Sequence, residues 1–322
     1  MSRVVVFDEF GAPDVMHVVT EPVPTPGAGE IRVKIEAFAI NPLDLMMRSG
    51  TSPAPVPLPH ARLGIEAAGT VDAVGTGVSG LGVGTPVILT AVPDSAVRGT
   101  YAEHTIVPAN RILVRPAGLD VVDAAAIWVA FSTAFGALVE TAAMQPGDQV
   151  LINAASGAVG RAAIQIARQV GAAPIAVTRS SAREAELLDA GAAAVVATDR
   201  DDVAAAVRRH TGGGGADIVL DLVGGPGQRE LANAARPGAS LIAAGFLDSR
   251  PSDPATPFHS YRSFVHTLDD AVVGRMADFL VAGLRRGVLR PTVDTVVSID
   301  EVVAAHRRME SGAHRGKIVA TT

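Results

Sequence analysis

The sequence contains no cysteine at any of its 322 positions. Disulfide bonds, thiolate zinc sites, iron–sulfur clusters and cysteine nucleophiles are therefore excluded. Long apolar runs are missing too, since the longest, near residues 124–139, is shorter than a membrane span and contains Ser132 and Thr133. At the N-terminus Asp8 and Glu9 interrupt the apolar run that a secretory signal would need. We therefore expect a cytoplasmic protein that makes no membrane contact.

Lysine is also scarce. The net charge is −6, the sequence pI is about 5.7, and the only lysines are Lys34 and Lys317. This balance argues against a nucleic-acid partner, which would require a basic surface. Hydrophobic residues make up 48% and charged residues 19%, which predicts a large core rather than a disordered chain. The length suits two domains or one large domain.

The first 118 residues are predicted to be rich in β-strands. Short apolar runs alternate there with clusters of Pro and Gly, which is typical of a small antiparallel barrel or sandwich. The runs cover residues 4–7, 31–40, 69–74, 87–91 and 101–107.

From residue 120 the pattern changes to alternating helices and strands. A helix over 120–139 precedes the alternation typical of a parallel, doubly wound sheet. Its strands are predicted at 150–153, 174–178, 194–197, 217–222 and 240–244, and its helices at 159–170, 181–190, 201–210 and 228–235. After a loop over 247–263, helices are predicted at 275–286 and 299–309 and strands at 292–297 and 317–320. Capping boxes are predicted at Ser181 with Glu184 and at Ser298 with Glu301.

The turn after the first strand of this series carries the clearest binding signal. The strand at 150–153 leads through small residues into an amphipathic helix, so that backbone N–H groups can approach a pyrophosphate. The pattern is AxxGxxG rather than GxGxxG, and a purely structural turn is the alternative. The predicted cofactor-binding residues of this turn are Ser156, Gly157, Ala158, Val159 and Gly160.

The next strand ends in Thr178, Arg179 and Ser180. NAD-preferring sites place an acidic residue about 20 positions after the glycine turn, where it binds the ribose 2′-hydroxyl. Here that place is taken by Arg179, and a guanidinium between two hydroxyls suits a 2′-phosphate. We therefore predict NADPH as the cofactor, with a solvated arginine as the alternative.

Short motifs follow one another along nearly the whole chain. They are Asn41-Pro42-Leu43-Asp44 with Arg48-Ser49-Gly50, Gly64-Ile65-Glu66-Ala67-Ala68-Gly69, Gly99-Thr100-Tyr101-Ala102-Glu103, the turn at 154–160, Asp217-Ile218-Val219-Leu220-Asp221 with Gly224-Gly225, and Arg315-Gly316-Lys317-Ile318-Val319. Together they resemble the quinone oxidoreductase and zeta-crystallin branch of the medium-chain dehydrogenase/reductase superfamily. Ala158 is a departure, since the branch has a second Gly there.

The resemblance implies an α/β fold in which a GroES-like β-barrel catalytic domain joins a Rossmann domain with a doubly wound parallel sheet. It implies that the cofactor binds in the cleft between them and that the protein is a homodimer. The domains are expected at residues 1–119 and 120–260, with residues 261–322 returning to the catalytic domain. The zinc ligands of the superfamily's alcohol dehydrogenases match Asn41 and Ile65 here, so no metal site is expected.

The implied activity is hydride transfer from NADPH to a quinone or an α,β-unsaturated carbonyl. A biosynthetic enoyl reductase acting on a carrier-bound or natural-product substrate is one alternative, and a crystallin-like structural protein that binds the cofactor without turnover is another. The proton donor stays open, because tyrosines found near Met46 and Thr51 in some members are missing.

The resemblance also implies the remaining site residues. Asn41 and Thr133 are the catalytic candidates near the nicotinamide; a turn residue before Pro42 and a helix hydroxyl bonded to its own backbone are the alternatives. Asp221 is expected to tie its strand end to the following loop. The further cofactor-binding candidates are Gly224, Gly245, Phe246 and Lys317, the last as a phosphate ligand or an ordinary basic residue of a terminal strand.

Overall fold

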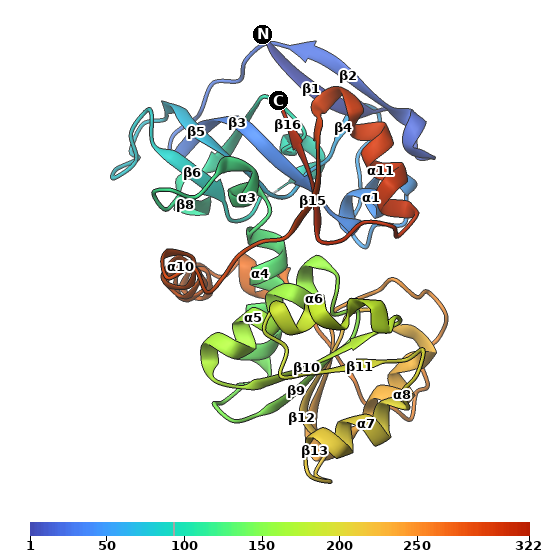
Figure 1. The fold of residues 1–322 in the computed structure, drawn as a ribbon. Helices are drawn as coiled ribbons and strands as arrows, with labels where there is room; N and C mark the ends of the chain where they lie inside the picture. The colour runs from blue at the N-terminus through green and yellow to red at the C-terminus, as the bar shows by residue number, and fades with distance from the viewer. Residues whose placement is uncertain (93) are drawn as a thin grey trace. The chain divides into compact units, whose positions relative to one another are not determined.

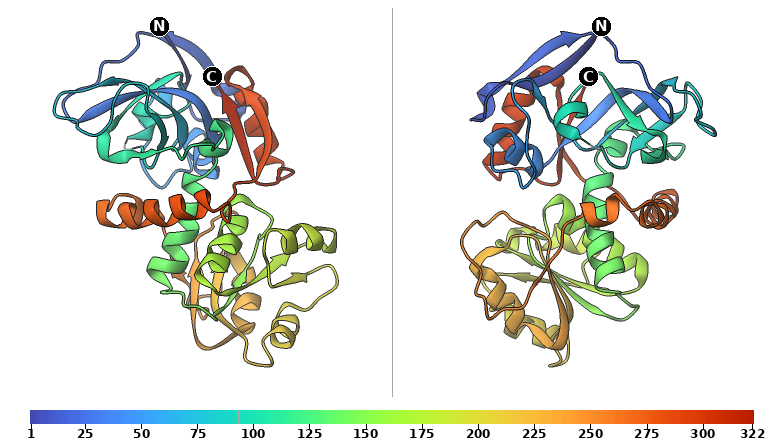
Figure 2. Two further views of the ribbon diagram at one scale, coloured as in Figure 1. Left: turned by 60° about the vertical axis from the view of Figure 1, so that its left-hand side comes forward. Right: turned by 180° about the vertical axis from the view of Figure 1, so that it is seen from behind.

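The computed structural model describes residues 1–92 and 94–322, which form two compact units (Figure 1). The first unit comprises Met1–Val129 and Pro291–Thr322, and the second comprises Ala130–Arg290. The domain limits expected from the sequence, 1–119, 120–260 and 261–322, differ from these boundaries and remain a prediction. In both views of Figure 2 the C-terminal segment lies in the same unit as the N-terminal strands.

The first unit contains a three-stranded sheet in the order β2-β1-β4 and a seven-stranded sheet. The larger sheet runs β15-β16-β3-β5-β6-β8, and β7 also pairs with β3. The strands are β1 (Ser2–Phe7), β2 (Met16–Glu21), β3 (Glu30–Ile40), β4 (Ala61–Arg62), β5 (Ala67–Val74), β6 (Pro86–Leu89), β7 (His104–Pro108), β8 (Ile112–Val114), β15 (Val293–Ser298) and β16 (Lys317–Thr321). The helices that begin in this unit are α1 (Pro42–Ser49), α2 (Ser95–Arg98), α3 (Val121–Ala125), α4 (Trp128–Phe135) and α11 (Val302–Glu310).

The strand β3 is central to the larger sheet, and the side chains of its first half alternate between core and solvent. Ile31, Val33 and Ile35 are fully buried, whereas Lys34 is exposed. Three other strands pair with it antiparallel, including β16 from the other end of the chain, with Ile318 opposite Ile40. The C-terminal segment therefore completes the sheet that the N-terminal residues begin.

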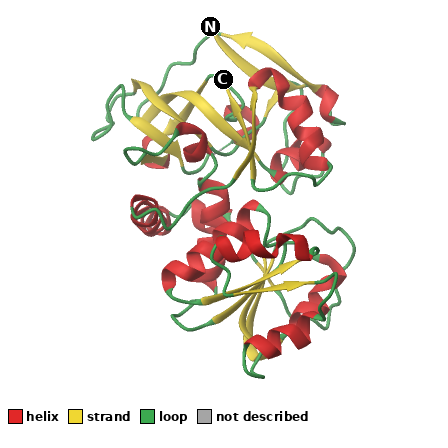
Figure 3. Ribbon diagram, viewed as in Figure 1, coloured by secondary structure: helices red, strands yellow, loops and turns green. Residues whose placement is uncertain are grey.

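The second unit is a six-stranded parallel sheet with helices on both faces (Figures 1 and 3). The strand order is β11-β10-β9-β12-β13-β14, so the first strand of the series is central and the winding reverses between β9 and β12. The strands are β9 (Gln149–Ile152), β10 (Ala173–Thr178), β11 (Ala194–Ala197), β12 (Ala216–Asp221), β13 (Ala235–Ala243) and β14 (His259–Ser260). The helices are α5 (Ala158–Val170), α6 (Glu184–Asp189), α7 (Val203–His210), α8 (Gln228–Asn233), α9 (Phe264–Thr267) and α10 (Asp270–Arg285).

The expected fold class, a GroES-like unit and a Rossmann unit, is confirmed, but several details differ. The single helix predicted over 120–139 is three segments, namely α3, α4 and a π-helical turn at Gly136–Thr141. At the break before α4, the N–H of Val129 donates a hydrogen bond to Glu66 Oε2 at 2.8 Å. Helix α10 begins five residues earlier than predicted, because Asp269 accepts hydrogen bonds from Ala271 and Val272.

One of the two predicted capping boxes is present. Ser298 and Glu301 form theirs at the start of the last helical segment. Ser181 does not, because the residue before it, Ser180, caps the turn by accepting from Ala182 N. The hydroxyl of Ser181 bonds instead to Asp199.

Candidate functional site

The carboxyl ends of the parallel strands carry most of the predicted cofactor-binding residues. The turn at 154–160 follows β9, Thr178 to Ser180 lie at the end of β10, Gly224 follows β12, and Gly245 and Phe246 follow β13. In open α/β sheets ligands bind outside the carboxyl ends of the strands, where the winding reverses. That point here lies between β9 and β12, which are hydrogen-bonded neighbours.

Asn153 and Asp221 hold the ends of β9 and β12 together. Asn153 Nδ2 donates to Asp221 Oδ1 at 2.5 Å, and Leu222 N donates to Asn153 Oδ1 at 2.6 Å. The fully buried Asp221 carboxylate also accepts from the backbone of Val223 and Gly224 and from Gln228 Nε2. The loops on the two sides of the switch point are thus tied to one another, as the sequence analysis expected of Asp221.

The two glycines of the turn after β9 have different surroundings. Gly157 is the N-cap of α5 and has no side chain with which to cap the first N–H groups, which are left for a phosphate or water. A Cβ on Gly160 would lie 2.6 Å from the Cα of Ala155, so α5 packs directly on the strand end. Ala154 adopts a left-handed φ of 43°, an uncommon conformation for a residue with a Cβ. This turn fits a dinucleotide pyrophosphate.

The end of β10 presents the residues predicted to read the ribose. Thr178 is buried, Arg179 is exposed, and the hydroxyl of Ser180 caps the next turn. The structure adds an acidic residue that sequence reasoning missed. Asp199 lies two positions beyond β11, and its Oδ2 accepts from Ser181 N at 2.9 Å and from Ser181 Oγ at 3.0 Å.

The loops after β12 and β13 touch through their backbones. A Cβ on Gly245 would lie 1.9 Å from the carbonyl carbon of Leu222, and Gly224 has a φ of 81°. Phe246 is 54% exposed and lies under the guanidinium of Arg262. Thr133, a catalytic candidate, is buried on α4 in the same unit.

The first unit contains a buried polar cluster of Asn41, Glu66 and Lys317. Lys317 Nζ bonds to Asn41 Oδ1 and to Glu66 Oε1, and Asn41 Nδ2 donates to Glu66 Oε1 at 3.0 Å. The second carboxylate oxygen of Glu66 accepts from Val129 N. All three side chains are nearly inaccessible, and Glu66 is completely so.

This cluster contains two of the predicted site residues. Lys317 was expected to be a phosphate ligand or an ordinary basic residue of a terminal strand, and the structure places its ammonium on the buried Glu66, whose charge would otherwise be uncompensated. Asn41 is the catalytic candidate of this unit, and both N–H groups of its side-chain amide donate, to Glu66 and to Ala39 O. Its Oδ1 accepts from Lys317 Nζ, and its side chain also takes part in the capping box at the start of α1.

A second buried network lies beside this cluster. Asp44 accepts from Asn41 N at 2.8 Å, Gly64 N at 3.0 Å and the Tyr101 hydroxyl at 3.1 Å. Burial nevertheless raises the pKa of Asp44 to about 7, against its usual value near 3.8. The Tyr101 oxygen also lies 3.1 Å from His306 Nε2, and burial, helped by the charge of Arg48, lowers the pKa of His306 to about 3. His306 comes from α11, and sequence reasoning did not single it out.

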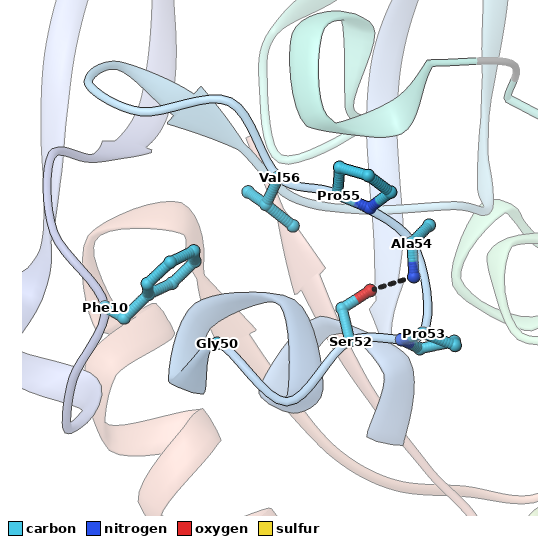
Figure 4. A pocket seen from close by; sticks show the side chains of 7 residues that line it. All are labelled: Phe10, Gly50, Ser52, Pro53, Ala54, Pro55 and Val56. Carbon is cyan, nitrogen blue, oxygen red and sulfur yellow. Dashed lines mark hydrogen bonds between the residues drawn. The ribbon is translucent and has the colours of Figure 1, made fainter.

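A pocket of about 320 Å³ lies at the C-terminal end of α1, whereas Asn41 is at the N-terminal end (Figure 4). The Phe10 side chain forms one wall, and the loop after the helix forms the other. Ser52 is the one hydroxyl among the lining side chains, and its Oγ accepts from Ala54 N. The lining residues are Phe10, Gly50, Ser52, Pro53, Ala54, Pro55 and Val56.

Two classes of feature are missing from the described part of the chain. Across residues 1–92 and 94–322, no helix is long and apolar enough to cross a membrane. Within the same ranges no three His, Asp or Glu side chains gather as metal ligands would.

Comparison with known proteins agrees with the fold. Residues 27–117 match the alcohol dehydrogenase GroES-like domain, and residues 190–319 match the zinc-binding dehydrogenase family. The quinone oxidoreductase of Lama guanicoe is 29% identical, over 99% of this chain and 97% of its own length. A mycocerosic acid synthase-like polyketide synthase of Mycolicibacterium smegmatis is 32% identical over 94% of this chain, which spans 14% of that protein.

Solved structures are similar over the whole chain. An NAD-dependent alcohol dehydrogenase has a TM-score of 0.88 and 30% identity, with 99% of both chains covered. A mycobacterial protein complexed with NADPH has a TM-score of 0.87 and 28% identity, with 99% of this chain and 100% of that chain covered. The similar structures therefore include one described as using NAD and one that contains NADPH.

Proposed function

This chain belongs to the zinc-independent quinone oxidoreductase branch of the medium-chain dehydrogenase/reductase superfamily, and from that premise we propose that it transfers hydride from NADPH to a quinone or an α,β-unsaturated carbonyl. The observation that carries the proposal is the tied switch point, where the turn at 154–160 and the Gly224 loop are held by Asn153 and Asp221. The relatives include a quinone oxidoreductase, an NAD-dependent alcohol dehydrogenase and a protein complexed with NADPH, which supports an oxidoreductase with a nicotinamide cofactor.

The residues of the second unit would bind and orient the cofactor, which supplies the hydride when bound. The backbone of residues 156–160 would bind the pyrophosphate, and Thr178, Arg179 and Ser180 would bind the adenosine ribose and its 2′-phosphate. The close backbone approach of Gly224 and Gly245 leaves no side chain between the loops, which suits the flat nicotinamide. Phe246, next to them, would shield this end of the site from water.

The residues of the first unit favour conjugated acceptors over simple ketones. The ammonium of Lys317 is held by Glu66 and Asn41, so little positive charge is left to polarise a carbonyl. Hydride addition to the β-carbon of an enone, or to a quinone, leaves an enolate or a hydroquinone anion that water can protonate. Asn41, the catalytic candidate of this unit, is itself part of this cluster.

The test is consumption of NADPH and NADH with a panel of quinones, small enones and enoyl thioesters. Turnover of NADPH with a quinone or enone would support the proposal and rank the acceptors. Turnover restricted to enoyl thioesters would favour a carrier-dependent enoyl reductase, to which the match with the polyketide synthase points. Tight nucleotide binding without turnover on any acceptor would favour the structural, crystallin-like role.

The role of Arg179 can be tested by binding alone. Removing its charge in Arg179→Ala should weaken NADPH by about 1.5–3 kcal/mol and leave NADH nearly unchanged, since a charged hydrogen bond to the 2′-phosphate is lost. Dissociation constants from nucleotide fluorescence would measure this. Arg229→Ala is the matched control, because Arg229 is an exposed arginine on α8 of the same unit. Equal loss for the two nucleotides would contradict the assignment.

The expected homodimer also belongs to this proposal. Large apolar side chains are exposed along residues 246–268, next to the edge strand β14. They are Phe246, Leu247, Phe264, Val265 and Leu268. A second copy of the chain would cover them, and a solution mass of twice 32.9 kDa by light scattering would support this arrangement.

A further inference from the structure

The predicted preference for NADPH rests on Arg179, which stands where NAD-binding proteins have an acidic residue. An acidic residue, Asp199, nevertheless lies close by, because it follows the neighbouring strand β11. We propose that Asp199 is a specificity-determining residue that opposes Arg179, so that the protein accepts both NADH and NADPH with a reduced preference for NADPH. This inference rests on the proposed function and concerns the same nucleotide site.

The parallel pairing of β10 with β11 brings the acid to this place. Thr178 lies opposite Ala197, so the residues that follow each strand leave the sheet side by side. Both donors of Ser181, its N–H and its hydroxyl, are given to Asp199 Oδ2 at 2.9 and 3.0 Å. A carboxylate is therefore in direct contact with Ser181, the residue that follows the three predicted to bind the 2′-phosphate.

This carboxylate is charged and available. The two hydrogen bonds from Ser181 hold the pKa of Asp199 below its usual value, so it is ionised at neutral pH. Arg200, the neighbouring cation, is bound to Glu184 at 2.8 Å and to Asp201 at 3.1 Å. Across residues 1–92 and 94–322, neither Asp199 nor Arg179 forms an ion pair within 4.0 Å that would remove its charge from the site.

The two nucleotides would meet this charge in opposite ways. A 2′-phosphate carries up to two negative charges, which Asp199 repels, and it cannot recruit the donors of Ser181 because Asp199 already holds them. A free 2′-hydroxyl can donate a hydrogen bond to the second carboxylate oxygen of Asp199, as it does to the acidic residue of NAD-binding sites. Arg179 attracts the 2′-phosphate, so the cofactor preference of the protein depends on the difference between the effects of Arg179 and Asp199 on nucleotide affinity.

The competing explanation is structural, since Asp199 could serve only to hold the Ser181 turn. The two explanations differ for Asp199→Asn, in which the ratio shifts only if the charge of Asp199 acts on the nucleotide. The companion variant is Ser181→Ala, which removes the hydroxyl bond but keeps the carboxylate. Under our proposal that change leaves the ratio of NADH to NADPH dissociation constants nearly unchanged. If Asp199 only holds the turn, Ser181→Ala and Asp199→Asn should affect both nucleotides alike.

The experiment measures the dissociation constants of NADPH and NADH for the full-length wild type, Asp199→Asn and Ser181→Ala at one ionic strength. Asp199→Asn should tighten NADPH about tenfold and weaken NADH severalfold. Asp199→Ser is a second variant that keeps an acceptor, and it should shift the ratio in the same direction. Asp253→Asn, on an acid elsewhere in the same unit, is the matched control and should change neither constant.

The outcomes separate this inference from the function on which it rests. A ratio that stays within twofold in Asp199→Asn and Asp199→Ser, with unchanged melting temperatures, would overturn the inference and leave the proposed function standing. A ratio that shifts as much in Ser181→Ala as in Asp199→Asn would also overturn it, because Ser181→Ala keeps the charge. Wild-type protein that binds neither nucleotide would overturn the proposed function itself.

Discussion

At the scale of single residues, the buried pair of Lys317 and Glu66 is the feature furthest from the expectation. The two residues are 251 positions apart, and they meet because β16 docks against β3. The sequence identifies each of them as part of a motif, but the pairing depends on strand packing that no local pattern records. For the same reason Asp199, His306 and the bond from Asn153 to Asp221 were not predicted, whereas the bonds of Asp221 to the loop that follows it were.

The buried pair predicts a large effect on stability. Lys317→Met removes the cation and leaves the Glu66 carboxylate buried without compensation, which should cost about 3–5 kcal/mol in the free energy of unfolding. Urea unfolding would measure this. The double variant Lys317→Met with Glu66→Gln removes both charges and should recover a large part of the loss. If it recovers nothing, the ion pair is not the source of the destabilisation.

At the scale of elements, the turn between β9 and α5 shows how the sequence pattern translates into geometry. The small residues at 154–160 predicted a turn in which backbone N–H groups can approach a pyrophosphate, and the structure shows that Gly160 also lets α5 pack against Ala155. The alternation of strands and helices was also predictable, because each element carries its own hydrophobic period. The broken helix over 120–139 was not, since Val129 bonds to Glu66 from a distant part of the chain.

Two glycine substitutions in this turn should differ in their effects. The Cβ of Gly160→Ala would lie 2.6 Å from Ala155 Cα, so the backbone must shift, which should cost about 1–3 kcal/mol of stability and weaken nucleotide binding. Gly157→Ala is the matched control for stability, because its Cβ would meet one atom, Ala154 O, at 3.3 Å. Thermal melts and nucleotide titrations would compare the two. A Gly160→Ala variant as stable as Gly157→Ala would contradict the packing argument.

At the scale of the whole molecule, the Asp44–Tyr101–His306 network joins the N-terminal part of the chain to its last helix. Its two end members respond to pH in opposite senses. The folded protein holds a proton on Asp44 up to about pH 7, so this group makes stability fall as pH rises from about 4 to 7. The folded protein keeps His306 neutral down to about pH 3, so this group makes stability rise as pH rises from about 3 to 6.5.

Because these contributions oppose each other, variants of the two ends should show slopes of opposite sign. Between pH 4.5 and 6.5, Asp44→Asn should gain about 2–3 kcal/mol relative to wild type, and His306→Gln should lose a similar amount. Urea unfolding at the two pH values would measure the slopes, independently of any constant loss from the substitutions. Parallel pH profiles for wild type and both variants would show that the network does not titrate in this way.

The burial of Lys317 has a practical consequence for chemical modification. Lys34 is exposed on β3 and Lys317 is enclosed, and the sequence contains no further lysine. An amine-reactive dye or crosslinker should therefore attach to native protein at Lys34 and at the N-terminal amine. Acylation of Lys317 during a short reagent pulse would then report, by mass spectrometry, each opening of the sheet that the two ends of the chain build together.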